Sequence, residues 1–263
     1  MPPYQLKAQI IRAETLAPDL YRLTFLAPDL AAEAKPGQFV MLRVGEGADP
    51  LLRRPFSIHQ VTASGWVQVL IKVVGKGTRL LATLAPGQTV DVVGPLGNRF
   101  SLHTSHHICL VGGGVGIAPL YFLARELQRS NPPAAVVPLL GARTAAELRP
   151  LADDFVALGL TPRLATDDGT LGHHGLVIAH LSELMATPAP WIVYCCGPYP
   201  MMRAVAKICR EQGWACQVSL ETMMACGLAA CLGCAVPAAD LAGPYKHVCK
   251  DGPVFGAEEV AWL

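Results

Sequence analysis

Charged residues are scarce in this sequence of 263 residues: Asp, Glu, Lys and Arg together make up 16% of it, and aromatic residues 6%. The 21 basic residues nearly cancel the 20 acidic ones, and no stretch gathers basic residues into a stripe. A nucleic-acid-coating protein needs such a stripe, so that class is excluded. The hydrophobic content of 52% excludes a disordered chain. Internal repeats and low-complexity linkers are also absent.

Two windows contain no Asp, Glu, Lys or Arg at all, namely residues 100–124 and 222–239. Each is close to the roughly 20 residues that a membrane-spanning helix needs. The first is broken by four glycines and a proline, and the second holds three cysteines among small residues, so we expect neither to cross a membrane. Lys7 and Arg12 interrupt the apolar stretch that a signal peptide requires, which predicts a cytoplasmic protein.

Short strands separated by Pro/Gly turns dominate the first hundred residues. Residues 38–44 and 66–74 are rich in β-branched side chains, and Pro-Gly turns occur at 35–37 and 85–87. Strands at such spacing predict a small closed antiparallel β-barrel, which we assign to residues 1–103.

Strands and helices alternate from about residue 106 onward. This alternation predicts a doubly wound parallel sheet in an α/β nucleotide domain over residues 104–220. The expected strands are 107–111, 135–140, 161–165, 191–196 and 215–220, and the expected helices are 119–129, 144–157 and 200–212. Residues 221–263 form a cysteine-rich segment that is too short to build a core alone, so we expect a cofactor to hold it.

Four of the nine cysteines are spaced C-x4-C-x2-C-x14-C, namely Cys226, Cys231, Cys234 and Cys249. The first half of this pattern is the plant-type spacing for a [2Fe–2S] cluster. Small residues between the first three cysteines allow the backbone to wrap tightly around a cluster. A zinc ion bound by four thiolates and ordinary buried cysteines are the alternatives. Zinc sites usually contain two short Cys pairs and only one is present here, which favours iron and sulfide.

A second motif, Arg54-Pro55-Phe56-Ser57, falls on a predicted barrel strand. Phe56, Ser57 and Arg54 together offer a flavin an apolar face, a hydroxyl group and a cation for its pyrophosphate. The turn Gly75-Lys76-Gly77-Thr78 precedes a helix-like stretch at 79–84, where backbone amides reach a phosphate. A solvated arginine beside a core phenylalanine, and a simple turn, are the alternatives.

A glycine-rich turn, Gly112-Gly113-Gly114-Val115-Gly116, lies between a predicted strand and helix, where a nucleotide phosphate would sit. Its spacing does not fit G-x-G-x-x-G, which excludes the usual dinucleotide fingerprint. Cys196-Gly197-Pro198 and Asp167-Asp168-Gly169 each end a later strand, where open α/β sheets bind ligands. Cys196 either contacts a nicotinamide ring or is a buried small hydrophobe.

The remaining cysteines and the paired histidines have plainer interpretations. We expect four cysteines to be buried as small hydrophobes, namely Cys109, Cys195, Cys209 and Cys216. With no partner cluster in the sequence, we expect the histidine pairs to be loop residues, namely His106/His107 and His173/His174.

These motifs together resemble the ferredoxin–NADP reductase superfamily and, more closely, the electron-transfer subunits of type B dihydroorotate dehydrogenase. The resemblance covers nearly the whole chain, and the tail ETMMACGLAACLGCAVP…YKHVCKDGPVF is its most specific part. It implies electron transfer from the FMN of a separate catalytic subunit, through [2Fe–2S] and FAD, to NAD⁺ in pyrimidine (UMP) biosynthesis. It further implies a heterotetramer of two catalytic and two electron-transfer subunits. No residue for dihydroorotate oxidation is expected on this chain.

The resemblance also assigns cofactors to matching positions. FAD would be bound by Arg54, Pro55, Phe56, Ser57, Ile71, Lys72, Val73, Gly77 and Thr78. NAD would be bound by Gly112, Gly113, Gly114, Val115, Gly116, Cys196, Gly197 and Pro198. The [2Fe–2S] cluster would be held by Cys226, Cys231, Cys234 and Cys249.

Two positions bear on how far the resemblance extends. Met223-Met224 stands where family members often have a basic residue followed by Met. Arg143 is placed to receive the 2′-phosphate of NADP, although the family implies NAD. Two other functions remain open: a reductase subunit of the ferredoxin–NADP reductase or sulfide dehydrogenase type, and a zinc-stabilised binding module without enzymatic activity.

Overall fold

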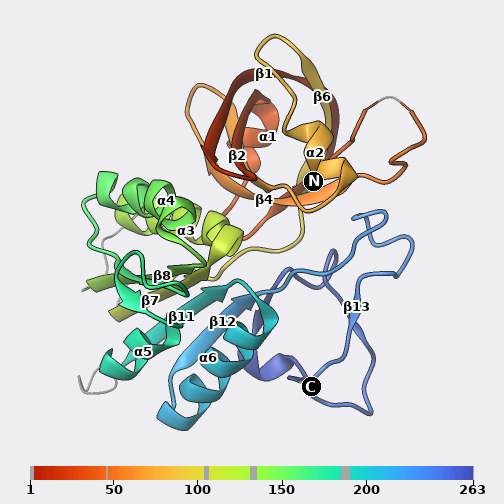
Figure 1. Cartoon of the computed structure of the whole chain (residues 1–263). Coiled ribbons are helices and arrows are strands. Elements are labelled where there is room, and N and C mark those ends of the chain that lie inside the picture. The colour runs from red at the N-terminus through yellow and green to blue at the C-terminus, as the bar shows by residue number, and fades with distance from the viewer. Residues whose placement is uncertain (1–2, 46, 104–106, 131–134, 185–189, 263) are drawn as a thin grey trace.

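The computed structural model describes residues 3–45, 47–103, 107–130, 135–184 and 190–262. It contains a β-barrel, an α/β unit and a C-terminal segment that contacts both (Figure 1). Among the described residues, no helix has the length and apolar character needed to cross a membrane.

The N-terminal part is a closed antiparallel barrel with strand order β1-β2-β5-β4-β3-β6, which confirms the predicted barrel. In β5, Val67, Val69 and Ile71 have no exposed surface, so alternate side chains fill the barrel interior. The strands are β1 (Tyr4–Ala17), β2 (Leu20–Leu26), β3 (Phe39–Leu42), β4 (Arg54–Val61), β5 (Trp66–Lys72) and β6 (Thr89–Leu96), and the two helices are α1 (Pro28–Glu33) and α2 (Lys76–Leu81).

The second part confirms the predicted α/β unit, with strand order β10-β9-β8-β7-β11-β12-β15. Its strands are β7 (His107–Gly113), β8 (Ala135–Ala142), β9 (Arg163–Thr166), β10 (His173–His174), β11 (Trp191–Cys196), β12 (Ala215–Ser219) and β15 (Val254–Gly256). Its helices are η1 (Gly114–Gly116), α3 (Ile117–Ser130), α4 (Ala145–Ala157), α5 (Ile178–Leu184) and α6 (Tyr199–Gln212). Buried side chains of α3 and α4 belong to one hydrophobic core, and those of α5 and α6 to another, so helices cover both faces.

Three details differ from the sequence expectations. The sheet is not purely parallel, because β15 pairs antiparallel with β12. His107 begins β7, in agreement with the expected strand 107–111 and not with the loop expected for the histidine pairs. His173 and His174 pair with β9 as β10, so they are not loop residues either. His106 lies outside the described residues. The helix expected at 79–84 is α2, which starts at residue 76 because the Thr78 hydroxyl accepts hydrogen bonds from the Val74 and Gly75 amides.

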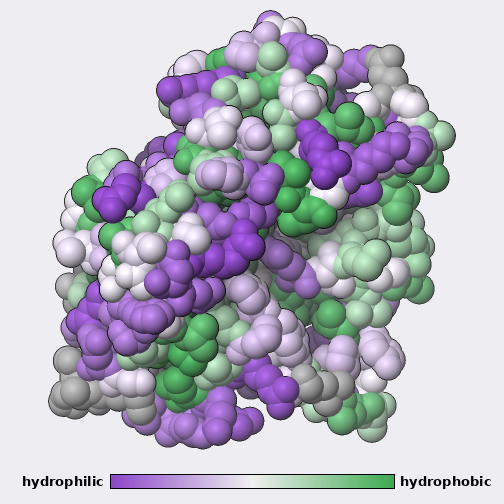
Figure 2. All heavy atoms as spheres, viewed as in Figure 1, coloured by the Kyte–Doolittle hydropathy of each residue, from purple (hydrophilic) through white to green (hydrophobic). Residues whose placement is uncertain are grey.

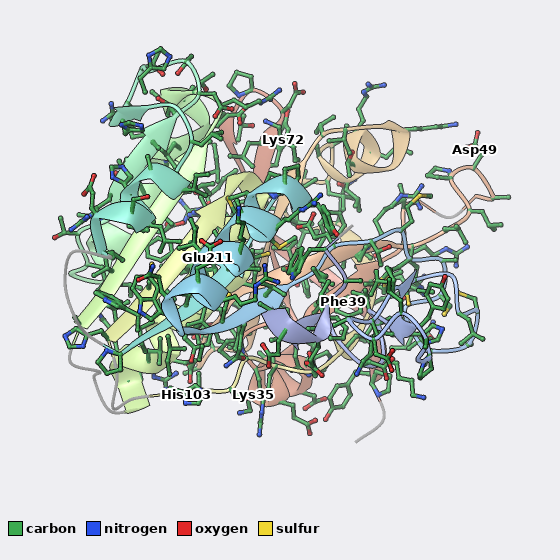
Figure 3. The ribbon with its side chains drawn as sticks, turned by 90° about the horizontal axis from the view of Figure 1, so that it is seen from below. Lys35, Phe39, Asp49, Lys72, His103 and Glu211 are labelled. Atoms are coloured by element: carbon green, nitrogen blue, oxygen red, sulfur yellow. The ribbon has the colours of Figure 1, made fainter. Side chains whose placement is uncertain are left out.

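The C-terminal segment contains β13 (Ala235–Val236), β14 (Lys246–His247), β15 and η2 (Ala257–Glu259) and joins the other two parts. Asn98, just after β6, donates to the carbonyls of Asp251 (2.9 Å) and Val254 (2.7 Å) and accepts from the Val254 amide. A Cβ atom at Gly97 would lie 2.5 Å from Pro253, so only glycine permits this approach. Phe39 of β3 shares a core with the C-terminal segment (Figure 3). The barrel and the sheet are therefore fastened together by the last part of the chain.

Candidate flavin, nucleotide and iron–sulfur sites

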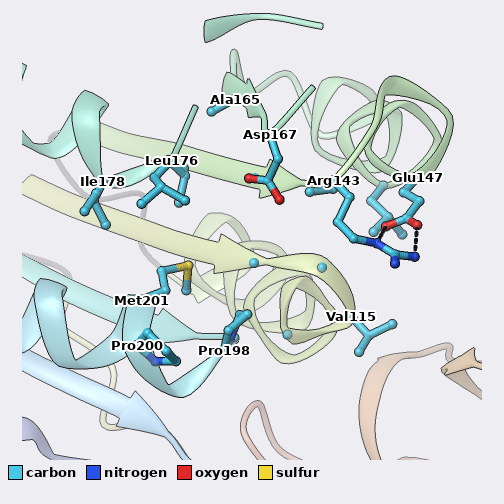
Figure 4. A pocket seen from close by; sticks show the side chains of 18 of the residues that line it. Val115, Arg143, Glu147, Ala165, Asp167, Leu176, Ile178, Pro198, Pro200 and Met201 are labelled. Atoms are coloured by element: carbon cyan, nitrogen blue, oxygen red, sulfur yellow. Dashed lines mark hydrogen bonds and ion pairs between the residues drawn. The ribbon is translucent and has the colours of Figure 1, made fainter. Parts of the chain in front are cut away.

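A cavity of about 610 Å³ opens at the carboxyl ends of the parallel strands (Figure 4). Gly113, Gly114, Val115 and Gly116 line it from the turn after β7, and Gly197 and Pro198 line it from the loop after β11. Open α/β sheets bind ligands at this edge. The structure therefore brings the two predicted nucleotide motifs together around one cavity.

The two loops touch so closely that side chains are excluded. A Cβ atom at Gly116 would lie 2.6 Å from both the Cys196 carbonyl oxygen and Gly197. Gly197 itself has φ 155°, and a Cβ atom there would lie 2.9 Å from the Gly113 amide nitrogen. The glycines are thus needed for contact between the loops as well as for space beside a ligand.

Cys196 lies behind this cavity and does not line it. Its side chain has no exposed surface, and burial raises the pKa of its thiol well above the ordinary value. Cys109, Cys195, Cys209 and Cys216 are also buried, as expected. The position of Cys196 favours the buried-hydrophobe interpretation over direct contact with a nicotinamide ring.

One carboxylate binds two cations at the cavity wall. Glu147 Oε1 accepts hydrogen bonds from Arg143 (2.6 Å; Figure 4) and from Lys72 of barrel strand β5 (2.7 Å). Burial acts to raise the pKa of Glu147, but the bonds from Arg143 and Lys72 outweigh it and hold that pKa below the ordinary value. Two cations therefore share one carboxylate, and all three side chains line the nucleotide cavity.

Sequence reasoning missed Glu147 and Glu221, both of which line the cavity. The spacing Thr144-x-x-Glu147 is a signal for a helix N-terminus, and the Thr144 hydroxyl does accept from the Glu147 amide. That signal predicts where α4 starts but not what the carboxylate binds. Asp167 follows β9 as expected and points its carboxylate into the cavity opposite Arg143 (Figure 4).

The predicted flavin residues lie on β4, on β5 and at the start of α2. The guanidinium of Arg54 lies against Gly77, where a Cβ atom would be 3.2 Å from Arg54 Nε. Arg54 also donates to the Leu52 carbonyl (2.7 Å), which holds the guanidinium beside the α2 turn. Arg54 and Gly77 thus form a cradle that suits a flavin pyrophosphate, with Phe56 and Ser57 half-buried on the same strand. Ile71 faces the barrel interior, so at most its backbone is available to a ligand.

The four predicted cluster cysteines are gathered as two pairs. Cys234 Sγ and Cys249 Sγ are 3.3 Å apart, and the Cys231 thiol lies close enough to that of Cys226 to help lower the pKa of Cys226. Within the described residues, no three His, Cys, Asp or Glu side chains converge on a single metal-ion position. Two thiol pairs suit a cluster with two irons better than one tetrahedral zinc ion.

Backbone amides already point at these sulfurs. Leu228 and Cys231 amides donate to Cys226 Sγ (3.3 and 3.4 Å), and the Ala229 amide donates to Cys249 Sγ (3.3 Å). Burial acts to raise the pKa of Cys226, but these amides lower it to about 7. Burial and the Cys234 thiol raise the pKa of Cys249 to about 11, so a metal has to displace that proton.

The loop holds strained backbone to aim these amides. Ala229 and Leu232 have φ of 61° and 58°, a left-handed conformation that non-glycine residues rarely adopt. Such strain is typical of ligand sites. The conformation of the cysteine loop therefore already suits the binding of a cluster through its cysteine sulfurs.

The barrel, the α/β unit and the paired thiols define a flavin- and nucleotide-dependent iron–sulfur oxidoreductase with a ferredoxin reductase-like fold. Three family models match the chain in succession: the oxidoreductase FAD-binding domain at residues 7–100, the oxidoreductase NAD-binding domain at 110–207, and the iron–sulfur cluster binding domain of dihydroorotate dehydrogenase B at 221–261.

Similar proteins make the assignment more specific. The dihydroorotate dehydrogenase B (NAD(+)) electron transfer subunit of Desulforamulus reducens is 41% identical, covering 97% of each chain. That of Bacillus caldolyticus is 42% identical, covering 93% of this chain and 94% of its own. A solved structure of an NADH-dependent reduced ferredoxin-NADP oxidoreductase, described in the context of flavin-based electron bifurcation, has a TM-score of 0.87 at 34% identity, covering 97% of this chain and 90% of its own. This chain belongs to the family of dihydroorotate dehydrogenase B electron transfer subunits.

Proposed function

We propose that this protein carries electrons between NAD(H) and an FMN-containing subunit that oxidises dihydroorotate, as part of a complex of two catalytic and two electron-transfer subunits. The observation that carries the proposal is the presence of three sites in one chain: the Arg54 cradle, the glycine-lined cavity and the paired thiols. The relatives are named electron transfer subunits, and this name implies a catalytic partner subunit.

Each part of the chain has a separate task in this proposal. When bound, FAD exchanges a hydride with NAD and single electrons with a [2Fe–2S] cluster. Arg54 neutralises a pyrophosphate, while the amides of the 112–116 turn bind the dinucleotide phosphates. Cys226, Cys231, Cys234 and Cys249 hold the irons, and the loop amides stabilise charge on the sulfurs.

We also propose that the cavity takes NAD(H) rather than NADP(H). A 2′-phosphate would have to compete with Glu147 for Arg143, because the two already form an ion pair. The carboxylate of Asp167 adds negative charge to the same cavity and suits a ribose hydroxyl better than a phosphate.

An exposed apolar surface surrounds the cysteine loop and suits a partner subunit. Met223, Leu228 and Leu232 are 89%, 49% and 57% exposed, beside the exposed thiol of Cys231. Figure 2 shows hydrophobic side chains gathered over this side of the molecule, on the right. Apolar patches of this kind mark interaction sites, and a cluster here would lie close to whatever covers it.

The purified chain tests the proposal directly. We expect flavin and iron–sulfur absorbance in the visible spectrum, oxidation of NADH with ferricyanide as acceptor, and no oxidation of dihydroorotate. Adding the FMN-containing subunit should give dihydroorotate-dependent reduction of NAD⁺ and a mass equal to two of each subunit. Dihydroorotate oxidation by this chain alone, or a colourless protein with bound zinc, would overturn the proposal.

A second candidate function rests on the 34% identity to the NADH-dependent reduced ferredoxin-NADP oxidoreductase, which spans nearly the whole chain. Under this candidate the chain is the corresponding subunit of such an oxidoreductase. Copurification decides between the two, because the partner carries FMN and oxidises dihydroorotate in the first case and reacts with ferredoxin in the second.

A further inference from the structure

The strand that carries the flavin motif is fastened to the helix that follows the nucleotide turn. His59 of β4 stacks on Tyr121 of α3, with ring centroids 4.5 Å apart and an interplanar angle of 20°. Two residues further along β4, the Val61 carbonyl accepts a hydrogen bond from Arg125 Nη1 of the same helix (2.9 Å), which also bonds to the Gln60 side chain. β4 and α3 are thus joined along a full turn of the helix.

A second helix of the α/β unit reaches the same histidine. His59 Nε2 lies 3.2 Å from Asp154 Oδ2 of α4, and Arg22 of β2 forms an ion pair with the same oxygen. A carboxylate only accepts hydrogen bonds, so His59 Nε2 is the donor. The His59 side chain is 1% exposed, Arg22 13% and Asp154 18%, so water competes little with these contacts.

This cluster joins the two elements that carry the flavin motif and follow the nucleotide turn. Arg54 to Ser57 begin the strand that His59 occupies, and Gly114 to Gly116 immediately precede the helix that carries Tyr121. Hydride transfer requires reacting atoms about 3–3.5 Å apart, and a displacement of 1 Å costs on the order of 10²-fold in rate.

We infer that His59 is a positioning residue for hydride transfer: held by Tyr121 and Asp154, it fixes the distance between the flavin strand and the nucleotide turn. The inference rests on the proposed function. It gives the buried cluster a role in the rate of the reaction between the two bound groups, separate from the affinity for either of them.

Two variants distinguish the contribution of the stack on Tyr121 from that of the hydrogen bond to Asp154. His59→Phe keeps a ring to stack on Tyr121 but loses the N–H donated to Asp154. His59→Gln keeps a donor for Asp154 but loses the stack. Arg129→Gln is the matched control, because Arg129 lies on the same helix, is 70% exposed and forms its ion pair with Glu126 of that helix.

The measurement is anaerobic stopped-flow bleaching of the flavin by saturating NADH, per bound FAD, in the full chain. For both His59 variants we expect at least a tenfold fall in the limiting rate, less than a threefold change in the NADH dissociation constant, and a weaker long-wavelength charge-transfer band between reduced flavin and NAD⁺. Arg129→Gln should match the wild type. FAD content and the melting temperature report folding, and a variant that binds no FAD is replaced by Asp154→Asn, which keeps the side-chain volume.

The outcomes are distinguishable. If NADH does not bleach the flavin of the wild-type chain, the proposed function fails and the positioning role fails with it. If the wild type reacts and a His59 or Asp154 variant with full FAD content keeps the wild-type limiting rate and charge-transfer band, the positioning role alone is overturned.

Discussion

Gly227 of the cysteine loop lies directly against Met41 of barrel strand β3. A Cβ atom at Gly227 would be 2.7 Å from Met41 Cγ, and Gly227 has φ 71°. Met41 is fully buried and lies opposite Pro55, within the flavin motif of β4. The cysteine loop therefore contacts the strand that pairs directly with the strand proposed to hold the flavin, which suits electron transfer between the two sites.

Replacing Cys231 by Ser should remove the cluster and leave the flavin in place. A hydroxyl group is a poor ligand for iron, whereas Arg54 and Gly77 lie on the barrel and are untouched by the change. We expect loss of iron and of cluster absorbance with an unchanged ratio of FAD to protein. Cys209→Ser, at a buried position outside the loop, is the control and should keep its iron. Retained cluster absorbance in Cys231→Ser would contradict the ligand assignment.

Replacing Glu147 by Gln should make the protein accept NADPH more readily. The amide releases Arg143 and Lys72, and a free guanidinium binds phosphate well. We expect kcat/KM for NADPH to rise about tenfold relative to that for NADH, which corresponds to about 1.4 kcal/mol. Glu183→Gln, which breaks an exposed ion pair with Arg163, should leave the ratio unchanged. If the ratio of kcat/KM for NADPH to that for NADH is the same in Glu147→Gln and Glu183→Gln, Arg143 plays no part in selecting the nucleotide.

Replacing Gly116 by Ala should weaken NADH binding and destabilise the fold. The added methyl group would meet backbone atoms of Cys196 and Gly197 at 2.6 Å, and backbone cannot move aside as a flexible side chain can. Overpacking of this kind costs about 1–3 kcal/mol. Urea unfolding and NADH titration measure the two effects. Gly47→Ala, where the nearest atom is 4.0 Å away, serves as the comparison and should change neither.

Stability should fall in mild acid because of His59. Burial is the main cause of its lowered pKa, opposed by the hydrogen bond to Asp154; Arg22 contributes to the lowering. Above pH 6.5 the histidine is neutral in both the folded and unfolded chain and adds no pH dependence. Below that value the unfolded chain takes up the proton first, so the free energy of unfolding falls by up to about 1.4 kcal/mol per pH unit until the folded pKa is reached.

The test compares urea unfolding at pH 7.5 and 5.5 for the wild type and His59→Phe. Between pH 7.5 and 5.5 the free energy of unfolding should fall less in His59→Phe than in the wild type. In His173→Asn, at an exposed position, it should fall as much as in the wild type. Tyr121 and Arg125 of α3 also face this region, so urea unfolding of variants at these two positions is measured at the same two pH values. An identical decrease in the wild type and His59→Phe would exclude His59 as the cause.

The sequence predicts those features that local patterns encode. The turns and β-branched runs predict the barrel, the alternation of strands and helices predicts the α/β unit, and the cysteine spacing predicts the paired thiols. Contacts between distant residues leave no local pattern: Lys72 and Glu147 are 75 positions apart, and His59 and Asp154 are 95 apart. These contacts form because the barrel and the helices pack together, which no single segment determines.

The three-residue strand β15 was also beyond sequence reasoning. Its residues, Val254 to Gly256, are too few for an alternating pattern, and they lie in a segment whose composition is dominated by the cysteines. Residues 254–256 form a strand because they pair with the edge of β12, which would otherwise be unpaired. The two-residue strand β10 illustrates the same point, since His173 and His174 become a strand only by pairing with β9.

The position of β15 in the chain has a consequence for synthesis. Residues 254–256 pair with β12 and, through Asn98, clamp the barrel, yet they are made after everything they bind. Until they leave the ribosome, β12 keeps an unpaired edge of the kind that recruits other strands. A chain truncated before residue 254 would therefore expose the edge of β12 to pairing with strands of other molecules.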